Sequence, residues 1–443
     1  MARSVEAHLD RWSTTSLLAL ALGVALLLRL AVMFAMADLS HGANLWEYGE
    51  QAVCALRTGG DLCLPYGRGA EGVYPSAYMP PLLSYFWLAL FHLFGDGAAA
   101  RAVWLAASLA VGLVNVWLVF RLTLELGRSR WAAFLAAGLL AAYPTFVFVT
   151  ATYHQTNWAV FFLLAIAFIA IRIAKSERVS LRDVVVGGVL CGAATLNRSE
   201  MLIAGPALLA LGAFWRRNLV DVVKVGLLGA VAMGLALAPW VVRNYQLFDR
   251  VIPVAQSTGY NLWKGFNPFT NGSGNMTEEP PGGPGDTFRM AVRDATPHGP
   301  RFETDLQDRY MQVFKADLAA ASPARLAQLS VNKILLLWVF DWTDDSITGQ
   351  LAYLAPWAAA NVLVVLGLAV LWRDRRQVDP ATAAICAGAL FLLTLAYVAT
   401  AVHSRYRMHI EPFLFIAAGI GAEALLAWLG NRLGRPKNEL APR

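Results

Sequence analysis

The run "TTSLLALALGVALLLRLAVMFAMA", residues 14–37, is apolar throughout except for Arg29. A helix of roughly 20 apolar residues crosses the hydrocarbon core of a bilayer, and this run is long enough to do so. It is also longer than the core of a signal peptide, and no small-residue cleavage site follows it. The sequence therefore predicts a transmembrane helix that is retained in the mature protein.

Similar runs recur along the chain. They cover residues 102–122, 131–150, 157–173, 184–196, 201–215, 220–242, 351–372, 381–401 and 412–429. The chain is 57% hydrophobic and only 15% charged, with 15 Trp, which is typical of a polytopic membrane protein. We expect an all-α fold with about ten transmembrane helices, in which residues 1–443 form one membrane-embedded domain.

Basic residues predict the orientation of these helices, because Lys and Arg near the ends of spans remain on the cytoplasmic side. They cluster in alternate loops: Arg3 and Arg11; Arg121, Arg128 and Arg130; Arg172, Lys175, Arg178 and Arg182; Arg216, Arg217 and Lys224; Arg373, Arg375 and Arg376; and the C-terminal tail. The net charge of +6 is thus a topology signal and does not indicate nucleic-acid binding.

The alternation predicts two large extracytoplasmic loops, residues 38–101 and 244–350. It requires that the apolar stretches 80–94 and 325–340 lie in the interface rather than cross the membrane. The second loop contains "NPFTNGSGNMTEEPPGGPGD", residues 267–286, whose Gly, Pro and Asn content predicts a mobile flap. It also contains a polar helical segment, residues 302–321.

The first outer loop opens with "ANLWEYGEQAVCALRTGGDLC", residues 43–63. At helical spacing one face is apolar, with Leu45, Tyr48, Ala52, Ala55 and Leu56, and the opposite face carries Glu47, Glu50, Gln51 and Cys54. The two carboxylates then point away from lipid. Cys54 and Cys63 are expected to form a disulfide in an oxidising periplasm, with two free thiols as the alternative, whereas Cys191 and Cys386 fall inside spans and are expected to be packing residues.

Several segments, in this order, resemble the GT-C superfamily of membrane glycosyltransferases, which includes protein O-mannosyltransferases and the lipid A aminoarabinose transferase. The segments are "EYGEQAVCALRTGGDLCLPYG" (47–67), "YPSAYMPPLLSYFWLALFHLFG" (74–95), "AAYPTFVFVTATYHQTNW" (141–158), "GAATLNRSEMLIAGPALL" (192–209), "LAPWVVRNYQLFDRVIPVAQSTGYNLWKGFNP" (237–268) and "HSRYRMHIEPFLFI" (403–416). Each is a loose pattern, and their shared order carries the resemblance.

The resemblance implies an inverting enzyme that moves a sugar from a polyprenyl phosphate to an acceptor hydroxyl on a glycan, lipid or protein. Such a reaction needs a carboxylate general base and cations that stabilise the leaving phosphate, but no cofactor or metal. The acidic stretch "DWTDD", residues 341–345, offers oxygen ligands without a complete set. The expected partners are the lipid-linked donor, the acceptor and membrane lipids. The expected location is a bacterial inner membrane, with the site on its periplasmic face.

Glu47 is the expected base, because "EYGEQA" matches the Glu-containing members of the superfamily. Glu50 and Asp38 remain alternatives for this role. Glu50, one turn further on, could instead orient the base or accept a hydrogen bond from the sugar.

Cations at the outer ends of spans run against the positive-inside bias, so their placement calls for an anion. We expect that anion to be the phosphate of the lipid donor. Arg405 and Arg407 are the first candidates, with lipid-headgroup contact or pairing with Glu411 as the alternative. Arg243 has the same placement, and Lys264 lies in the loop that follows.

Further substrate contacts are expected at outer turns of the chain. These are Arg198, Glu200, His154, Tyr48, Tyr74, Asn267 and Tyr406, with Tyr78 and Trp263 as additional rings that could stack on sugar. An Arg198–Glu200 pair with a purely structural role is an open alternative. So are a lipid-linked glycan polymerase or ligase, a lipid or solute transporter or flippase, and a non-catalytic subunit.

Overall fold

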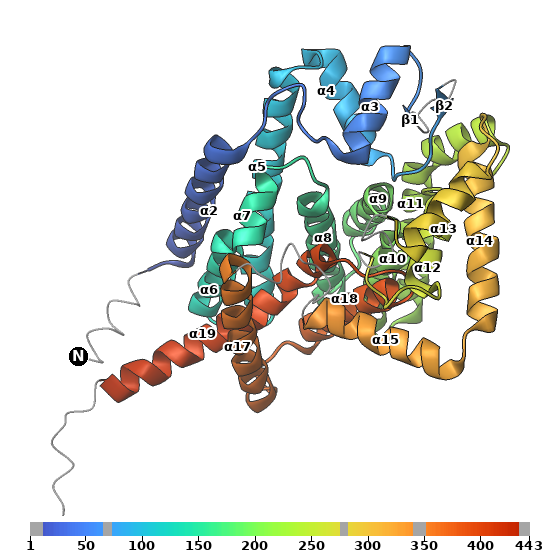
Figure 1. Ribbon diagram of the computed structural model, residues 1–443. Helices are drawn as coiled ribbons and strands as arrows, with labels where there is room; N and C mark the ends of the chain where they lie inside the picture. Colours follow the sequence, from blue (N-terminus) through green and yellow to red (C-terminus); the bar gives the residue numbers. More distant parts are fainter. Residues whose placement is uncertain (1–11, 65–72, 275–281, 340–350, 434–443) are drawn as a thin grey trace, which may run out of the picture.

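The computed structural model describes residues 12–64, 73–274, 282–339 and 351–433, which are almost entirely helical (Figure 1). The elements are α2 (Thr14–Met36), α3 (Trp46–Thr58), β1 (Cys63–Leu64), β2 (Tyr74–Pro75), α4 (Leu82–Phe94), α5 (Ala98–Glu125), α6 (Arg130–Ala142), α7 (Pro144–Thr150), α8 (Thr156–Lys175), α9 (Leu181–Asn197), α10 (Met201–Trp215), α11 (Leu219–Phe248), α12 (Thr258–Phe266), α13 (Pro284–Asp294), α14 (Phe302–Ala320), α15 (Pro323–Trp338), α17 (Leu351–Arg373), α18 (Pro380–Val398), the 3₁₀ helix η1 (Ser404–His409) and α19 (Glu411–Leu433).

The all-α polytopic fold predicted from the apolar runs is confirmed, since every predicted run forms a helix or a pair of helices. Within the described residues, seven helices are long and apolar enough to cross a membrane, or eight if the bent pair α6–α7 is one span. The predicted runs at 184–196 and 201–215 form the shorter helices α9 and α10, of 17 and 15 residues. The predicted number of about ten transmembrane helices exceeds eight because it includes α9 and α10, which are shorter than the helices counted as long enough to cross a membrane.

The flap predicted at residues 267–286 extends across residues 275–281, which lie outside the described part of the chain, as does the stretch 341–345. The polar segment predicted at 302–321 forms α14, and the short apolar stretches at 80–94 and 325–340 contain α4 and α15.

Helices α17 and α19 approach each other closely through glycine. A Cβ atom at Gly421 would meet the Leu363 carbonyl oxygen, and one at Gly367 would meet that of Ala417. Lipid provides no hydrophobic drive between helices, so small residues that allow close backbone contact supply the packing. Helix α19 also packs against α6, where Gly419 lies against the backbone of Ala132 and Ala136.

Arg29, the one charge in the first span, lies buried beside a break in another helix. The chain bends by 55° between α6 and α7, where Pro144 has no N–H to donate to the preceding turn. Arg29 Nη1 donates to the Ala141 carbonyl at 2.8 Å, and Nη2 donates to the Leu140 carbonyl at 3.3 Å. The guanidinium thus satisfies backbone groups for which lipid offers no partner.

The predicted cytoplasmic loops meet at one end of the bundle. Lys175, after α8, pairs with Glu125 at the end of α5 (3.1 Å) and with Asp379 before α18 (3.3 Å). Arg128 pairs with Asp374 at 3.6 Å. These pairs place the basic loops after α5, α8 and α17 together, as the alternation of charge requires.

Helices α3 and α4 lie together above the other end of the bundle, with β1 and β2 beside them (Figure 1). Tyr48 and Ala52 are buried with Trp87, which stacks on Trp104 of α5 at 4.4 Å between ring centroids. A disulfide joins Cys54 of α3 to Cys63 of β1, and β1 pairs with β2. The predicted apolar face of α3 is therefore the buried one.

Candidate functional site

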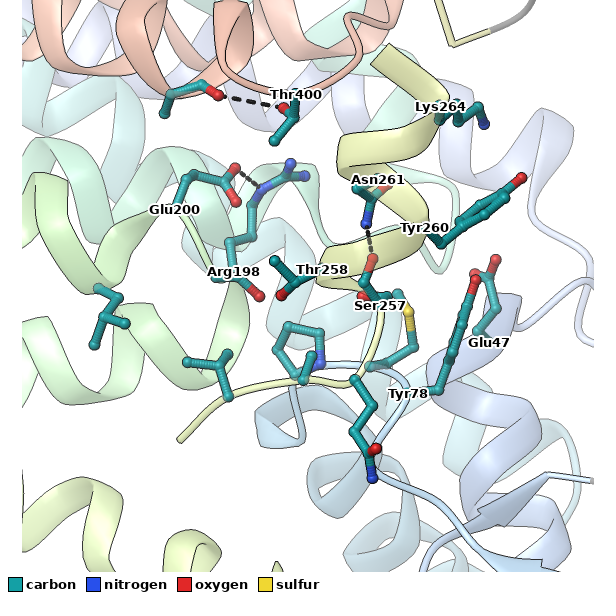
Figure 2. Close-up of a pocket in the computed structure, with 18 of the residues that line it drawn as sticks. Glu47, Tyr78, Arg198, Glu200, Ser257, Thr258, Tyr260, Asn261, Lys264 and Thr400 are labelled. Carbon is teal, nitrogen blue, oxygen red and sulfur yellow. Dashed lines mark hydrogen bonds and ion pairs between the residues drawn. The ribbon is translucent and has the colours of Figure 1, made fainter. Parts of the chain in front are cut away.

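A cavity of about 1240 Å³ lies under the cap formed by the first outer loop. Figure 2 shows some of the residues that line this cavity. Its wall is built from the start of α3, the turns 154–155 and 197–200, residues 253–264, the first turns of α14, and the segment from the end of α18 into η1. Nine of the predicted site residues line it together: Glu47, Tyr48, Tyr78, His154, Arg198, Glu200, Lys264, Arg405 and Tyr406. They come from regions far apart in the sequence, and the fold alone brings them together.

Glu47 is an exposed carboxylate in this wall, at the second residue of α3. Within the described part of the chain no hydrogen bond or ion pair engages it. The preceding residue, Trp46, has a left-handed φ of 56°, which is strained for a bulky residue. The Trp46 ring contacts that of His154 at 4.7 Å, so packing holds this turn in place. The abrupt turn into α3 fixes where Glu47 enters the cavity wall.

Arg198 is a buried cation whose partners are already in place. Its Nε donates to Glu200, which also accepts a hydrogen bond from the Tyr397 hydroxyl at 3.0 Å, and its guanidinium lies 4.9 Å from the Tyr406 ring. Burial alone would lower the pKa of Arg198, but Glu200 and the surrounding tyrosines raise it above its ordinary value. Arg198 is thus a permanently charged group, held beside Glu200 in Figure 2.

Arg405 differs from Arg198 because it is exposed and keeps its hydrogen-bond donors available. Its guanidinium lies over the rings of Trp46 (5.8 Å) and Tyr406 (5.9 Å). No hydrogen bond or ion pair to it occurs among residues 12–64, 73–274, 282–339 and 351–433. Arg405 can therefore bind an anion in the cavity without breaking an existing interaction.

The two histidines of the wall are uncharged near neutral pH. Burial, followed by Arg405 and Arg198, lowers the pKa of His154 to about 3. Burial, followed by Lys264 and Arg405, holds the pKa of His403 well below its ordinary value. Lys264 Nζ lies 3.5 Å from His403 Nε2 and 5.5 Å from the centre of the Tyr260 ring. The positive charge of the site thus comes from arginine and lysine.

Several predicted site residues do not line the cavity. Glu50 lies one turn beyond Glu47, and much of its side chain is exposed. The partial burial of its carboxyl, followed by the charge of Glu47, raises the pKa of Glu50. Tyr74 lies in β2, and Asp38 is exposed, with a pKa lowered by its hydrogen bonds to Ser40. The Asn267 side chain donates to the Trp263 and Lys264 carbonyls at the end of α12.

Arg407 is directed away from the cavity, although it is only two residues from Arg405. It donates to Glu411 at 3.0 Å and to the Val339 carbonyl at 2.6 Å, and its side chain is buried. These contacts match the Glu411 pairing that the sequence left as an alternative.

Arg243 anchors α11 to the first outer loop. It donates to Asp61 at 2.6 Å and to the backbone carbonyls of Ser76 (2.9 Å) and Leu62 (3.2 Å). Burial raises the pKa of Asp61, but the hydrogen bond and charge of Arg243 outweigh it, so the net shift is downward.

These contacts predict that Arg243→Leu acts on stability rather than on the chemical step. Losing part-buried, charge-assisted hydrogen bonds should lower the free energy of unfolding by about 2 kcal/mol. Thermal unfolding in detergent measures this loss, and turnover per folded molecule should stay close to wild type. Asp61→Asn is the matched control, because it removes the other partner of the same ion pair. Its loss of stability should therefore not add to that of Arg243→Leu. Loss of turnover at unchanged stability would contradict this role.

The cavity residues that went unpredicted include the following three groups. Gln155 and Asn197 adjoin predicted residues; the Gln155 amide oxygen, in the orientation that satisfies its neighbours, accepts from Arg198 Nη1 at 3.1 Å. Residues 257–261 are the N-cap and first turn of α12, and Tyr260 faces the cavity on the same side as Glu47 and Tyr78 in Figure 2. Glu303 lies in the polar helix α14, which contains several acids that no sequence pattern distinguishes from one another.

The two additional rings that were predicted to stack on sugar lie in different places. Tyr78 lines the cavity, whereas Trp263 is buried and stacks on Phe288 at 5.4 Å behind the wall. In the described residues no group of three or more His, Cys, Asp or Glu side chains could hold a metal ion.

Residues 78–242 match the family model described as dolichyl-phosphate-mannose-protein mannosyltransferase. The fold matches the oligosaccharyltransferase of Archaeoglobus fulgidus in its apo form, with a TM-score of 0.55, 14% identity, and coverage of 96% of this chain and 52% of that one. It also matches the archaeal oligosaccharyltransferase AglB from the same organism in complex with an inhibitory peptide and a dolichol phosphate, with a TM-score of 0.54, 16% identity, and coverage of 98% and 53%.

A third match is ArnT from Cupriavidus metallidurans in the apo state, with a TM-score of 0.38, 16% identity, and coverage of 92% of this chain and 77% of that one. The comparison with curated proteins finds no match. The chain spans about half the length of the oligosaccharyltransferase whose fold it shares. The family model and the fold confirm the resemblance to GT-C membrane glycosyltransferases.

Proposed function

We propose, from the premise that this chain is a membrane glycosyltransferase with the GT-C fold, that it transfers a sugar from a polyprenyl phosphate to an acceptor hydroxyl with inversion. One observation carries the proposal: Glu47 and Arg405, each without a hydrogen bond or ion pair in the described part of the chain, line the same cavity. A free carboxylate and a free guanidinium are the groups needed at the two ends of such a displacement. AglB, which shares the fold, was solved with a dolichol phosphate, which supports a lipid-phosphate donor.

In the proposed reaction, the acceptor oxygen attacks the anomeric carbon on the face opposite the phosphate. The new carbon–oxygen bond forms as the bond to the phosphate oxygen breaks, and the electron pair of that bond leaves with the phosphate. Glu47 takes the acceptor proton as the acceptor oxygen becomes bonded to carbon. A single displacement of this kind inverts the anomeric centre.

The leaving phosphate is stabilised by Arg405, with Arg198 as a fixed positive charge behind it. Arg198 needs no rearrangement to act, because Glu200 and Gln155 already hold it. Preorganised charge of this kind is effective because it costs no reorganisation during the reaction. Lys264 adds a further cation on the α12 side of the cavity.

Aromatic side chains form part of the wall against which the sugar ring would lie. Trp46, Tyr78, Tyr260 and Tyr310 all line the cavity. The Asn197 side chain is buried beside Arg198, and its amide atoms have no hydrogen-bond partner among the described residues. Aromatic surface and unused hydrogen-bonding capacity suit a polyhydroxylated ligand.

The proposed location is a bacterial cytoplasmic membrane with the cavity on the periplasmic side. The Cys54–Cys63 disulfide lies in the cap above the cavity, and disulfides persist in oxidising compartments. The basic loops gather at the other end of the bundle, as expected for the cytoplasmic side.

Mass spectrometry of lipid co-purified with the protein, followed by turnover of the identified polyprenyl-phosphate sugar, tests this function. We expect the free polyprenyl phosphate to accumulate only when a hydroxyl acceptor is present. Movement of intact lipid-linked sugar across proteoliposomes, with no cleavage of the sugar–phosphate bond, would overturn the proposal in favour of a flippase.

A further inference from the structure

A buried polar network connects the two outer loops at the wall of the cavity, which Glu303 helps to line. It consists of Glu303 on α14, Ser76 after β2, Gln51 on α3 and Ser84 on α4, called here the Glu303 network. All four residues are buried: three have no exposed surface, and Glu303 is 3% exposed. Such a network is costly unless its members are satisfied, so its contacts require an explanation.

The hydrogen bonds of the network follow one direction. Ser84 Oγ donates to Gln51 Oε1 at 2.8 Å, and Gln51 Nε2 donates to Ser76 Oγ at 2.9 Å. Ser76 Oγ then donates to Glu303 Oε1 at 2.5 Å, while the Ala77 amide donates to Glu303 Oε2 at 2.7 Å. Both oxygens of Glu303 are therefore engaged by the first outer loop.

The Glu303 network joins the two walls between which the proposed reaction takes place. Gln51 lies one turn after Glu47 on α3, so the two residues share a face of that helix. Gln307 and Tyr310, which line the cavity, lie one and two turns after Glu303 on α14. The backbone N–H of Gln256 adds a further link by donating to the Ala77 carbonyl at 2.7 Å.

We propose that Glu303 is a positioning residue that sets the distance and orientation between Glu47 and the α14 wall. This inference rests on the proposed function. Glu303 acts through Ser76 and Gln51, and its carboxyl takes no part in bond making. Its contribution is geometric, because a misplacement of about 1 Å can reduce a reaction rate by as much as 10²-fold.

The carboxyl is suited to a structural link inside the protein. Burial raises the pKa of Glu303 to about 8, although the Ala77 hydrogen bond acts to lower it. Near neutral pH the group is therefore largely uncharged, and glutamine is its closest mimic in shape and charge. Glutamine keeps an oxygen for the Ala77 amide. Its NH₂ group can donate to Ser76 Oγ, so the hydrogen bond between the two side chains is kept with its direction reversed.

The test compares Glu303→Ala with Glu303→Gln and with Asp305→Ala, which removes another acid from the first turn of α14. We expect Glu303→Ala to lower kcat by roughly 10- to 100-fold, with little change in KM for the lipid donor. Glu303→Gln should restore kcat to within a few-fold of wild type, and Asp305→Ala should behave as wild type. Ser76→Ala should lower kcat as well, and its effect should not add to that of Glu303→Ala.

Hydrogen exchange gives a readout that does not require turnover. The peptide 74–79 contains the Ala77 amide and the Tyr78 amide, which donates to Ser76 Oγ at 3.1 Å. Exchange in this peptide should be faster in Glu303→Ala and unchanged in Glu303→Gln and Asp305→Ala. An unchanged exchange rate in Glu303→Ala, or equal turnover in Glu303→Ala and Asp305→Ala, would overturn the inference. Absence of turnover in the wild type would contradict the proposed function and leave the exchange test intact.

Discussion

Glu47→Gln lowers kcat by about 10²- to 10⁴-fold and leaves binding of the lipid donor unchanged. The reason is that an amide cannot take the acceptor proton, and general-base catalysis contributes an effect of this size. The substitution keeps the shape of the side chain and breaks no hydrogen bond or ion pair that the described residues make. Steady-state turnover of the polyprenyl-phosphate sugar, together with a separate donor-binding measurement, checks this prediction.

Glu50→Gln is the matched control for Glu47→Gln. Glu50 is exposed on the same helix one turn away, but it does not line the cavity. We expect turnover close to wild type for Glu50→Gln and for Asp38→Asn. Full activity in Glu47→Gln, with loss of activity in either control, would move the base to that residue.

Arg405→Gln lowers kcat/KM for the lipid donor by about 10²- to 10³-fold, which is the typical cost of removing one preorganised donor from a developing negative charge. Arg405 contacts the rings of Trp46 and Tyr406 without an ion pair in the described chain, so the fold should tolerate its replacement. Donor affinity should fall as well, because the guanidinium contacts a phosphate that is already charged before the reaction. Kinetics at several donor concentrations separate the two effects.

Arg250→Gln and Arg407→Gln are the controls that show whether the effect on donor kinetics is specific to Arg405. Arg250 pairs with Asp308 on the surface at 2.9 Å, and its loss should change nothing in the kinetics. Arg407→Gln should lower stability instead, because it leaves the buried Glu411 without its cation. Wild-type donor kinetics in Arg405→Gln would show that the phosphate is bound elsewhere.

The all-α membrane fold could be predicted because its signals are local. An apolar run needs only its own length to identify it, and the α3 face with Tyr48 and Ala52 follows from helical spacing. The order of the motifs along the chain also carries the GT-C resemblance, because order, like an apolar run, can be seen in the sequence without any distance. Helical spacing also places Gln51 on the face of α3 that carries Glu47 and Glu50, but spacing does not reveal that its side chain is buried and hydrogen-bonded to Ser76 and Ser84.

The roles of the cations could not be separated from the sequence. Arg243, Arg405 and Arg407 all lie near outer ends of predicted spans, yet only Arg405 lines the cavity. The difference depends on partners distant in the chain, such as Asp61 for Arg243, and a span-end position contains no information about them. Glu303 was missed for the same reason, since its partner Ser76 lies 227 residues away.

The contact between Arg29 and the α6–α7 bend has a consequence for how the chain is assembled. An arginine at the centre of an isolated helix costs about 2.5–3.5 kcal/mol on insertion scales, and its partners Ala141 and Leu140 are synthesised more than a hundred residues later. Until they emerge from the ribosome, the first segment carries a guanidinium without these backbone acceptors. Biogenesis should therefore keep this segment close to water or to the insertion machinery until the α6–α7 segment arrives, and only then release both into lipid.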